Sequence, residues 1–205
     1  MVHRLRRIQL LCHFRRIYRH QWSGRSQHKA PWTHHRYLGI RWGRQHSTIL
    51  AEVCRTIGTP DSSGNGYYAV YADTPRGNAN YCAWHSYGTC GGTPVQFAYF
   101  FKLDGDAGCD PDDTSGLHSQ GLAAIANVSG HELSEARTDP ASPGAWYDSR
   151  GAENGDKCAW TFGAPLVTFS NGSQWKIQGE WSNAAFTAGT GYPNSSGQKG
   201  CLSGK

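Results

Sequence analysis

The feature that most constrains this fold is a long stretch with helical spacing, residues 116–138. Apolar side chains recur there every three to five positions or so, at Leu117, Leu122, Ile125, Val128 and Leu133. Ser115 stands where a capping residue is expected, and Pro140 prevents the helix from continuing. A helix of this length must bury its apolar face, so the rest of the chain has to supply a surface for it.

The segments outside this helix indicate short strands and loops. Residues 95–103, VQFAYFFKL, form the most apolar run and are predicted to be the central strand. The other expected elements are a helix over 47–57, a strand over 67–72, a cysteine-bounded loop over 78–92 and a hairpin with strands in 166–169 and 174–181. Together they predict an α+β fold, in which one long helix packs on a small, mostly antiparallel sheet within a loop-rich, disulfide-stapled domain.

Charge divides the chain into a basic tail and an acidic domain. Residues 1–46 contain eleven Lys and Arg, seven of the ten His, and no Asp or Glu. Residues 47–205 contain nine basic and fifteen acidic side chains, a net charge of about −6 by the same count. The domain is therefore expected to span 47–205, and its acidity argues against nucleic acid as its partner.

The basic tail has three possible origins. Its composition is what a wrong start or a frameshift would produce, and we favour this interpretation because it also accounts for a missing signal peptide. A genuine arm could instead grip phosphates and stack bases on Trp22, Trp32 and Trp42, which would make nucleic acid a partner. The third origin is an unusual targeting segment. We leave the tail out of the fold prediction.

Cysteine usage indicates an oxidising compartment. One cysteine, Cys12, lies in the tail, and six lie in the domain: Cys54, Cys82, Cys90, Cys109, Cys158 and Cys201. None forms a C-x-x-C pair, so disulfides are favoured over a zinc ribbon. Six cysteines allow fifteen connectivities, and the short spacing favours Cys82–Cys90 as one pair.

The expected location is therefore extracellular, although a signal peptide is not evident in this chain. The apolar run over residues 8–12 is too short for one and is soon followed by Arg15 and Arg16. No run of about 18 apolar residues occurs, so no association with a membrane is expected.

The predicted long helix carries His131-Glu132-Leu133-Ser134-Glu135. His131 and Glu135 are four residues apart and share a helix face, so both can bind one metal ion. Glu132 can then act as the general base that activates a water. The arrangement matches the H-E-x-x-H helix of zinc metallopeptidases with the second His replaced by Glu. Zinc is the expected cofactor, although carboxylates also suit calcium, magnesium or manganese.

A further ligand must come from elsewhere in the chain. Glu153 and Asp156 are the main candidates, because both lie in a Gly-rich segment that can fold back on the helix. His85 and Asp139 are weaker candidates, and Asp139 could instead cap the helix or orient His131.

Two other groups of residues have a functional and a structural interpretation. Trp146 and Tyr147 could line a substrate cleft, although packing in the core is favoured. Calcium could bind the acidic loop 104–113, at Asp104, Asp106, Asp110 and Asp112, but the loop lacks the Gly and closing Glu of an EF-hand. A solvated acidic loop is the favoured interpretation.

The run over residues 130–158, GHELSEARTDPASPGAWYDSRGAENGDKC, resembles the signature of the phosphate-induced (EXORDIUM-like) family and its bacterial relatives. That signature reads H-E-x-x-E, T-[DN]-P, A-W-Y and E-x-x-D-x-C. The matching residues are His131, Glu132, Glu135, Thr138, Asp139, Pro140, Ala145, Trp146, Tyr147, Glu153, Asp156 and Cys158. Residues 81–86, YCAWHS, are similar to the family's Cys-aromatic-His segment, and the resemblance extends from about residue 67 to residue 201.

The resemblance implies a secreted protein, since plant members of the family are associated with the cell wall. The chain departs from the family at its front, where strands rich in Gly-Gly-Pro and Trp-Tyr-Gly have no counterpart in residues 1–46.

Two functions are therefore expected. The first is a secreted zinc metallopeptidase-like hydrolase acting on a peptide or a cell-wall-associated substrate. The alternative is a non-catalytic extracellular or wall-associated protein whose metal site is structural.

Overall fold

The computed structural model describes residues 6–9, 35–38, 46–63, 65–141 and 146–203. Expectations that concern the rest of the basic tail, including its tryptophans and Cys12, lie outside the described residues. Within the described part the chain is mixed α/β, with two helices of seven residues or longer rather than one. No helix in that part is long and apolar enough to cross a membrane.

The described residues contain three helices, α2 (His46–Ile57), α3 (Gln120–Thr138) and α4 (Asn183–Thr187). α3 begins later than predicted because Ser119, rather than Ser115, caps it. The Ser119 hydroxyl accepts a hydrogen bond from the N–H of Leu122. The helix ends at its C-cap residue, Asp139, just before Pro140. The motif therefore lies on a helix of nineteen residues, and α2 adds a second one of twelve.

The larger sheet has five strands in the order β2 (His35–Leu38), β1 (Arg6–Gln9), β3 (Tyr67–Pro75), β5 (Thr93–Lys102) and β4 (Ala83–Cys90). β3 and β5 run parallel, and the other neighbouring pairs of this sheet are antiparallel. β4 turns into β5 through Gly91 and Gly92, whose φ angles of 57° and 84° suit a tight hairpin turn. The predicted loop over 78–92 was wrong, because pairing with β5 draws most of it into β4.

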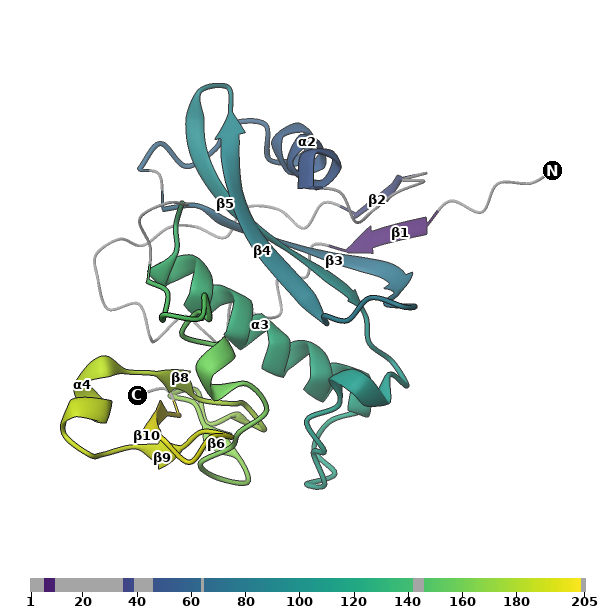
Figure 1. Ribbon diagram of the computed structural model, residues 1–205. Helices are drawn as coiled ribbons and strands as arrows, with labels where there is room; N and C mark the ends of the chain where they lie inside the picture. Colours follow the sequence, from purple (N-terminus) through teal and green to yellow (C-terminus); the bar gives the residue numbers. More distant parts are fainter. Residues whose placement is uncertain (1–5, 10–34, 39–45, 64, 142–145, 204–205) are drawn as a thin grey trace.

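The strand predicted to be central, β5, lies between β3 and β4 and is buried on both faces. On one face the Phe97 ring lies 5.2 Å from the ring of His46 in α2. On the other, Phe100 stacks on Tyr71, whose hydroxyl lies 3.0 Å from Ser129 Oγ in α3. α2 and α3 thus cover opposite faces of the sheet (Figure 1), which explains why β5 is an almost continuous apolar run.

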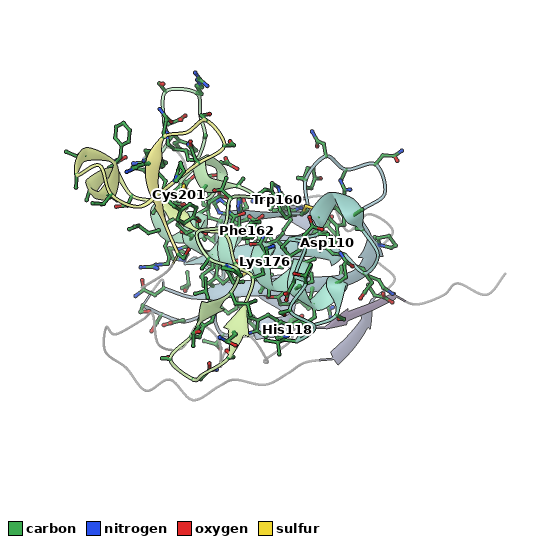
Figure 2. All side chains as sticks on the ribbon, turned by 90° about the horizontal axis from the view of Figure 1, so that it is seen from below. Asp110, His118, Trp160, Phe162, Lys176 and Cys201 are labelled. Carbon is green, nitrogen blue, oxygen red and sulfur yellow. A yellow bond between two sulfur atoms is a disulfide. The ribbon has the colours of Figure 1, made fainter. Side chains whose placement is uncertain are left out.

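The C-terminal part of the chain lies beyond α3 from the sheet (Figure 1). The predicted hairpin is confirmed in a shorter form, as β6 (Val167–Thr168) with β7 (Gln174–Trp175). The end of its predicted second strand is instead β8 (Glu180–Trp181), which forms a small antiparallel sheet with β10 (Lys199–Leu202) and β9 (Tyr192–Pro193). This part also contains α4. Lys176 and His118 attach this part to the segment before α3 (Figure 2): Lys176 Nζ donates to the Asp112 carbonyl at 2.9 Å, and His118 stacks on Trp175 at 3.6 Å.

Three disulfides staple the domain, and they pair differently from the prediction. The pairs are Cys54–Cys90, Cys82–Cys109 and Cys158–Cys201. The predicted bond Cys82–Cys90 cannot form, because the two cysteines stand at opposite ends of β4. Eight steps along an extended strand separate Cα atoms by about 26 Å, whereas a disulfide needs about 6 Å. The three bonds indicate an extracellular or otherwise oxidising environment.

Removing the C-terminal disulfide should destabilise the protein substantially. Cys158–Cys201 closes the longest loop of the three bonds, with a sequence separation of 43 residues. Loop-closure entropy predicts that Cys158→Ser with Cys201→Ser lowers the free energy of unfolding by about 4 kcal/mol. Urea denaturation of the full chain measures this loss. A loss below about 1 kcal/mol would contradict the prediction.

Candidate metal centre

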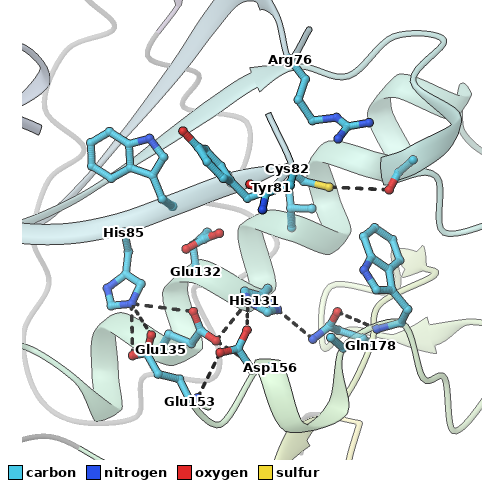
Figure 3. A pocket seen from close by; sticks show the side chains of 17 residues that line it. Arg76, Tyr81, Cys82, His85, His131, Glu132, Glu135, Glu153, Asp156 and Gln178 are labelled. Carbon is cyan, nitrogen blue, oxygen red and sulfur yellow. Dashed lines mark hydrogen bonds and ion pairs between the residues drawn. The ribbon is translucent and has the colours of Figure 1, made fainter. Parts of the chain in front are cut away.

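A pocket opens between β4, α3 and the loop around the short helix η2 (Asp156–Cys158) (Figure 3). The ionisable side chains among its described lining residues, cysteine and tyrosine apart, are four carboxylates, two imidazoles and one guanidinium: Glu132, Glu135, Glu153, Asp156, His85, His131 and Arg76. The guanidinium of Arg76 is held by both carboxylate oxygens of Asp106, each at 2.7 Å. Acidic groups and imidazoles therefore determine the chemistry of the pocket.

α3 contributes the three charged residues of the H-E-x-x-E motif. His131 and Glu135 lie on one face of the helix, and Glu132 lies at the edge of that face. Because one turn separates them, His131 Nε2 lies 3.0 Å from Glu135 Oε1, as the spacing predicted. The Glu135 side chain is almost fully buried, with the residue 3% exposed, and Glu132 is 5% exposed. Figure 3 draws no hydrogen bond or ion pair between the Glu132 carboxylate and the other side chains of the pocket.

β4 contributes His85, which sequence analysis ranked as a weaker candidate. His85 is the register partner of Ala98 in β5 and is directed from the sheet towards α3 (Figure 3). Its Nε2 lies 3.2 Å from Glu153 Oε1 and 3.7 Å from Glu135 Oε2. β4 thus places a second imidazole, that of His85, beside Glu135 Oε2, while His131 faces Oε1 of the same carboxylate.

Glu153, just before η2, and Asp156, the first residue of η2, are the two main candidates for a further ligand. The backbone N–H of Asp156 donates to Glu135 Oε1 at 3.1 Å, and Asp156 Oδ1 lies 3.6 Å from His131 Nε2. The N–H of Glu153 donates to Asp156 Oδ2 at 3.1 Å. Gly155 permits this close approach, because a Cβ there would lie 2.9 Å from Glu135 Oε1.

Three other predicted residues lie outside the pocket lining. Asp139 caps α3 through its N–H and accepts a hydrogen bond from the Tyr147 hydroxyl. Trp146 packs on the cluster that contains the Cys158–Cys201 disulfide and Trp181. The aromatic residues that do line the pocket are Tyr81, Trp84 and Trp160.

The acidic loop 104–113 does not contribute to a metal-ligand group among the described residues. Asp106 is engaged by Arg76 and accepts from the N–H of Gly108, where it caps the short helix η1 (Ala107–Cys109). Asp110 accepts from the N–H of Asp112. These contacts give the loop a structural role.

Gln178 and Glu180 are the site residues that sequence analysis missed. Gln178 Nε2 lies 3.0 Å from His131 Nδ1 and donates to the Gly155 carbonyl, while its Oε1 accepts from the N–H of Trp160. This amide therefore orients the imidazole so that Nε2 faces the carboxylates. Both residues lie more than 40 positions after His131, Gln178 between β7 and β8 and Glu180 in β8, where no spacing rule could connect them with the motif.

Burial and crowding shift the protonation of the central groups. Burial raises the pKa of Glu132 to about 8, helped by the neighbouring Glu135 and Glu153 and opposed by both imidazoles. Burial opposes the charge of His131, but its hydrogen bond to Glu135 and the nearby carboxylates outweigh burial and raise its pKa to about 10. Burial, with repulsion from Glu135, also holds the pKa of Glu180 well above its usual value.

The donor set suits a divalent transition metal. Two groups of three side chains offer atoms within 4.8 Å of one another, His85 with Glu135 and Glu153, and His131 with Glu135 and Asp156. Imidazole nitrogen and carboxylate oxygen are both accepted zinc ligands. A cation would also offset the burial and the carboxylate repulsion that together raise the pKa of Glu132. The residues present therefore fit a metal ion.

Comparisons with protein-family models, with curated proteins and with solved structures found no match. The resemblance of residues 130–158 to the phosphate-induced family therefore stays a prediction.

The metal-free protein should lose stability as the pH rises from 5 to 8. Folded Glu132 keeps its proton to a pKa of about 8, whereas the unfolded chain releases it near 4.5, so each added pH unit favours the unfolded state. His131 acts in the same direction, because its stabilising charge is lost as the pH rises from 6.5 towards 10. In Glu132→Gln, the loss in the free energy of unfolding between pH 5 and pH 8 should be about 3 kcal/mol smaller than in the wild type.

Urea denaturation of the full chain with a chelator, at pH 5 and pH 8, measures the effect. Asp73→Asn is the control, because that carboxylate is 54% exposed and pairs with Lys102 at the surface. A wild-type protein as stable at pH 8 as at pH 5 would contradict the assignment of Glu132 as a buried acid.

Proposed function

We propose that this protein is a secreted zinc-dependent hydrolase of the metallopeptidase type, with Glu132 as its general base. The observation that carries the proposal is the convergence of two imidazoles on one buried carboxylate, beside a second buried carboxylate. His131 and Glu135 come from α3, His85 comes from β4, and Glu132 follows His131 in the same pocket. The three disulfides and the resemblance over residues 130–158 support secretion.

The residues that would hold zinc are His131 and Glu135 with Asp156, and His85 and Glu153 form a second group of ligands around Glu135. When bound, zinc supplies a Lewis acid that polarises a carbonyl and lowers the pKa of water. The Gln178 amide restrains the plane of the His131 ring through its contact with Nδ1. Ligand orientation in this site is thus built into the fold.

Glu132 has the properties that a general base requires. It follows His131 in the helix, so its side chain points about 100° away from that of His131. Glu132 therefore lines the pocket in a different direction from Glu135. In the metal-free protein burial raises its pKa to about 8, and a nearby cation would return it to the carboxylate form. Glu132 would then accept the proton of the attacking water and deliver it to the leaving amine.

The rim of the pocket supports a peptide or a cell-wall-associated compound as the substrate. Tyr81 and Trp160 line it and are 41% and 42% exposed. The Trp160 backbone has a φ of 56°, a region that bulky residues rarely adopt, and its N–H is held by Gln178. Exposed aromatic side chains beside a polar centre can contact the apolar parts of such a substrate.

A second candidate function is a non-catalytic extracellular or wall-associated protein with a structural metal. The observation that favours it is the number of carboxylates. Each of the two ligand groups, His85 with Glu135 and Glu153 and His131 with Glu135 and Asp156, contains two anionic ligands, which would make a bound zinc ion a weaker Lewis acid.

Two substitutions on α3 separate these functions. In a hydrolase, Glu132→Gln should retain the metal and lower turnover by about 10²–10⁴-fold, because the general base is lost. Glu135→Gln should weaken metal binding itself. A cleavage screen with peptide libraries and wall extracts, run with metal analysis on the same samples, measures both effects. Wild-type activity in Glu132→Gln would exclude the mechanism, and a metal-loaded protein without activity towards any substrate would favour the structural role.

A further inference from the structure

The two groups of metal-ligand side chains share a single residue, Glu135. Its Oε1 lies 3.0 Å from His131 Nε2, and its Oε2 lies 3.7 Å from His85 Nε2. Each imidazole also has a carboxylate of its own. His85 lies 3.2 Å from Glu153, and His131 lies 3.6 Å from Asp156. The pocket therefore contains two similar half-sites, one on each oxygen of Glu135 (Figure 3).

This geometry does not suit one ion bound by both imidazoles. Zinc–nitrogen bonds are about 2.1 Å long, so two nitrogens on one zinc ion lie at most about 4.2 Å apart. Among the described residues, no group with all ligand atoms within 4.8 Å of one another contains both His85 and His131. A carboxylate that presents one oxygen to each imidazole is instead the arrangement of a bridging ligand between two ions.

The charge of the pocket points in the same direction. Four carboxylates, Glu132, Glu135, Glu153 and Asp156, are among the described residues that line it. The one guanidinium among those residues, Arg76, is already paired with Asp106. With all four carboxylates ionised, one divalent ion would leave two negative charges in the pocket, whereas two divalent ions balance all four.

We infer that the centre holds two zinc ions bridged by Glu135, one bound by His131 and Asp156 and the other by His85 and Glu153. This inference deepens the proposed hydrolase and rests on it. Two-metal sites with ions about 3.5–4 Å apart occur in aminopeptidases and phosphatases, where they orient substrate and stabilise both the attacking and the leaving groups. For the peptide chemistry proposed here, the second half-site would add a contact to the reacting end of the substrate.

Zinc titration of the full-length protein tests the inference. The basic tail contains seven histidines that can also bind zinc, so the stoichiometry has to be taken as a difference. The baseline is the double variant His85→Ala with His131→Ala, which lacks both half-sites and retains the tail. Equilibrium dialysis of chelator-treated protein should give two more equivalents for the wild type than for this baseline. Each single variant, His85→Ala or His131→Ala, should bind one more equivalent of zinc than the baseline.

Cobalt provides a second readout that does not depend on activity. Two cobalt ions bridged by one carboxylate should be magnetically coupled in the wild type, and Glu153→Gln, which keeps both imidazoles, should weaken the second ion and abolish the coupling. His118→Ala is the matched control, because His118 stacks on Trp175 outside the pocket.

The possible results distinguish this inference from the proposed function. A difference of two equivalents with magnetic coupling supports both. A difference of one equivalent, lost in His131→Ala and retained in His85→Ala, overturns the two-ion centre and leaves the hydrolase proposal standing. No difference between wild type and baseline overturns both.

Discussion

The centre of this protein depends on one buried carboxylate, Glu135. One of its oxygens faces His131 in its own helix and accepts the N–H of Asp156, and the other faces His85 in the edge strand. These contacts join α3, β4 and the start of η2 at a residue that is 3% exposed. A buried charge of this kind is tolerated only when its lone pairs are satisfied, so the three segments hold one another in position.

The same arrangement opposes folding in the absence of a cation. Glu132 and Glu180 are buried near Glu135, and burial raises the pKa of both carboxyl groups. Two disulfides brace the segments that carry the acidic and imidazole groups of the pocket: Cys82–Cys109 fastens the start of β4, and Cys158–Cys201 fastens η2 to β10. By restricting the unfolded chain, such bonds offset part of the cost of collecting acidic groups in one pocket.

Errors in the sequence-based fold arose where long-range pairing overrides local composition. The Gly and Ser within residues 83–90 and the flanking cysteines favoured a loop, yet antiparallel pairing with β5 makes these residues a strand. Once they are extended, Cys82 and Cys90 cannot meet, and Cys90 reaches Cys54 of α2 instead. The Gly91-Gly92 turn is the one local signal that could have revealed this hairpin.

The amino-acid sequence alone determined the parts of the centre that depend on helix geometry. The four-residue spacing of His131 and Glu135, and the neighbouring position of Glu132, follow from 3.6 residues per turn, and the Gly-rich segment after Pro140 indicated Glu153 and Asp156. Only the tertiary structure decided that His85 faces the second oxygen of Glu135, that Gln178 holds the His131 ring, and that Asp139, Trp146 and Tyr147 lie outside the pocket. The reason is physical: contacts within a helix are set by local dihedral angles, whereas contacts between a strand, a helix and a loop exist only after the sheet has paired and the core has packed.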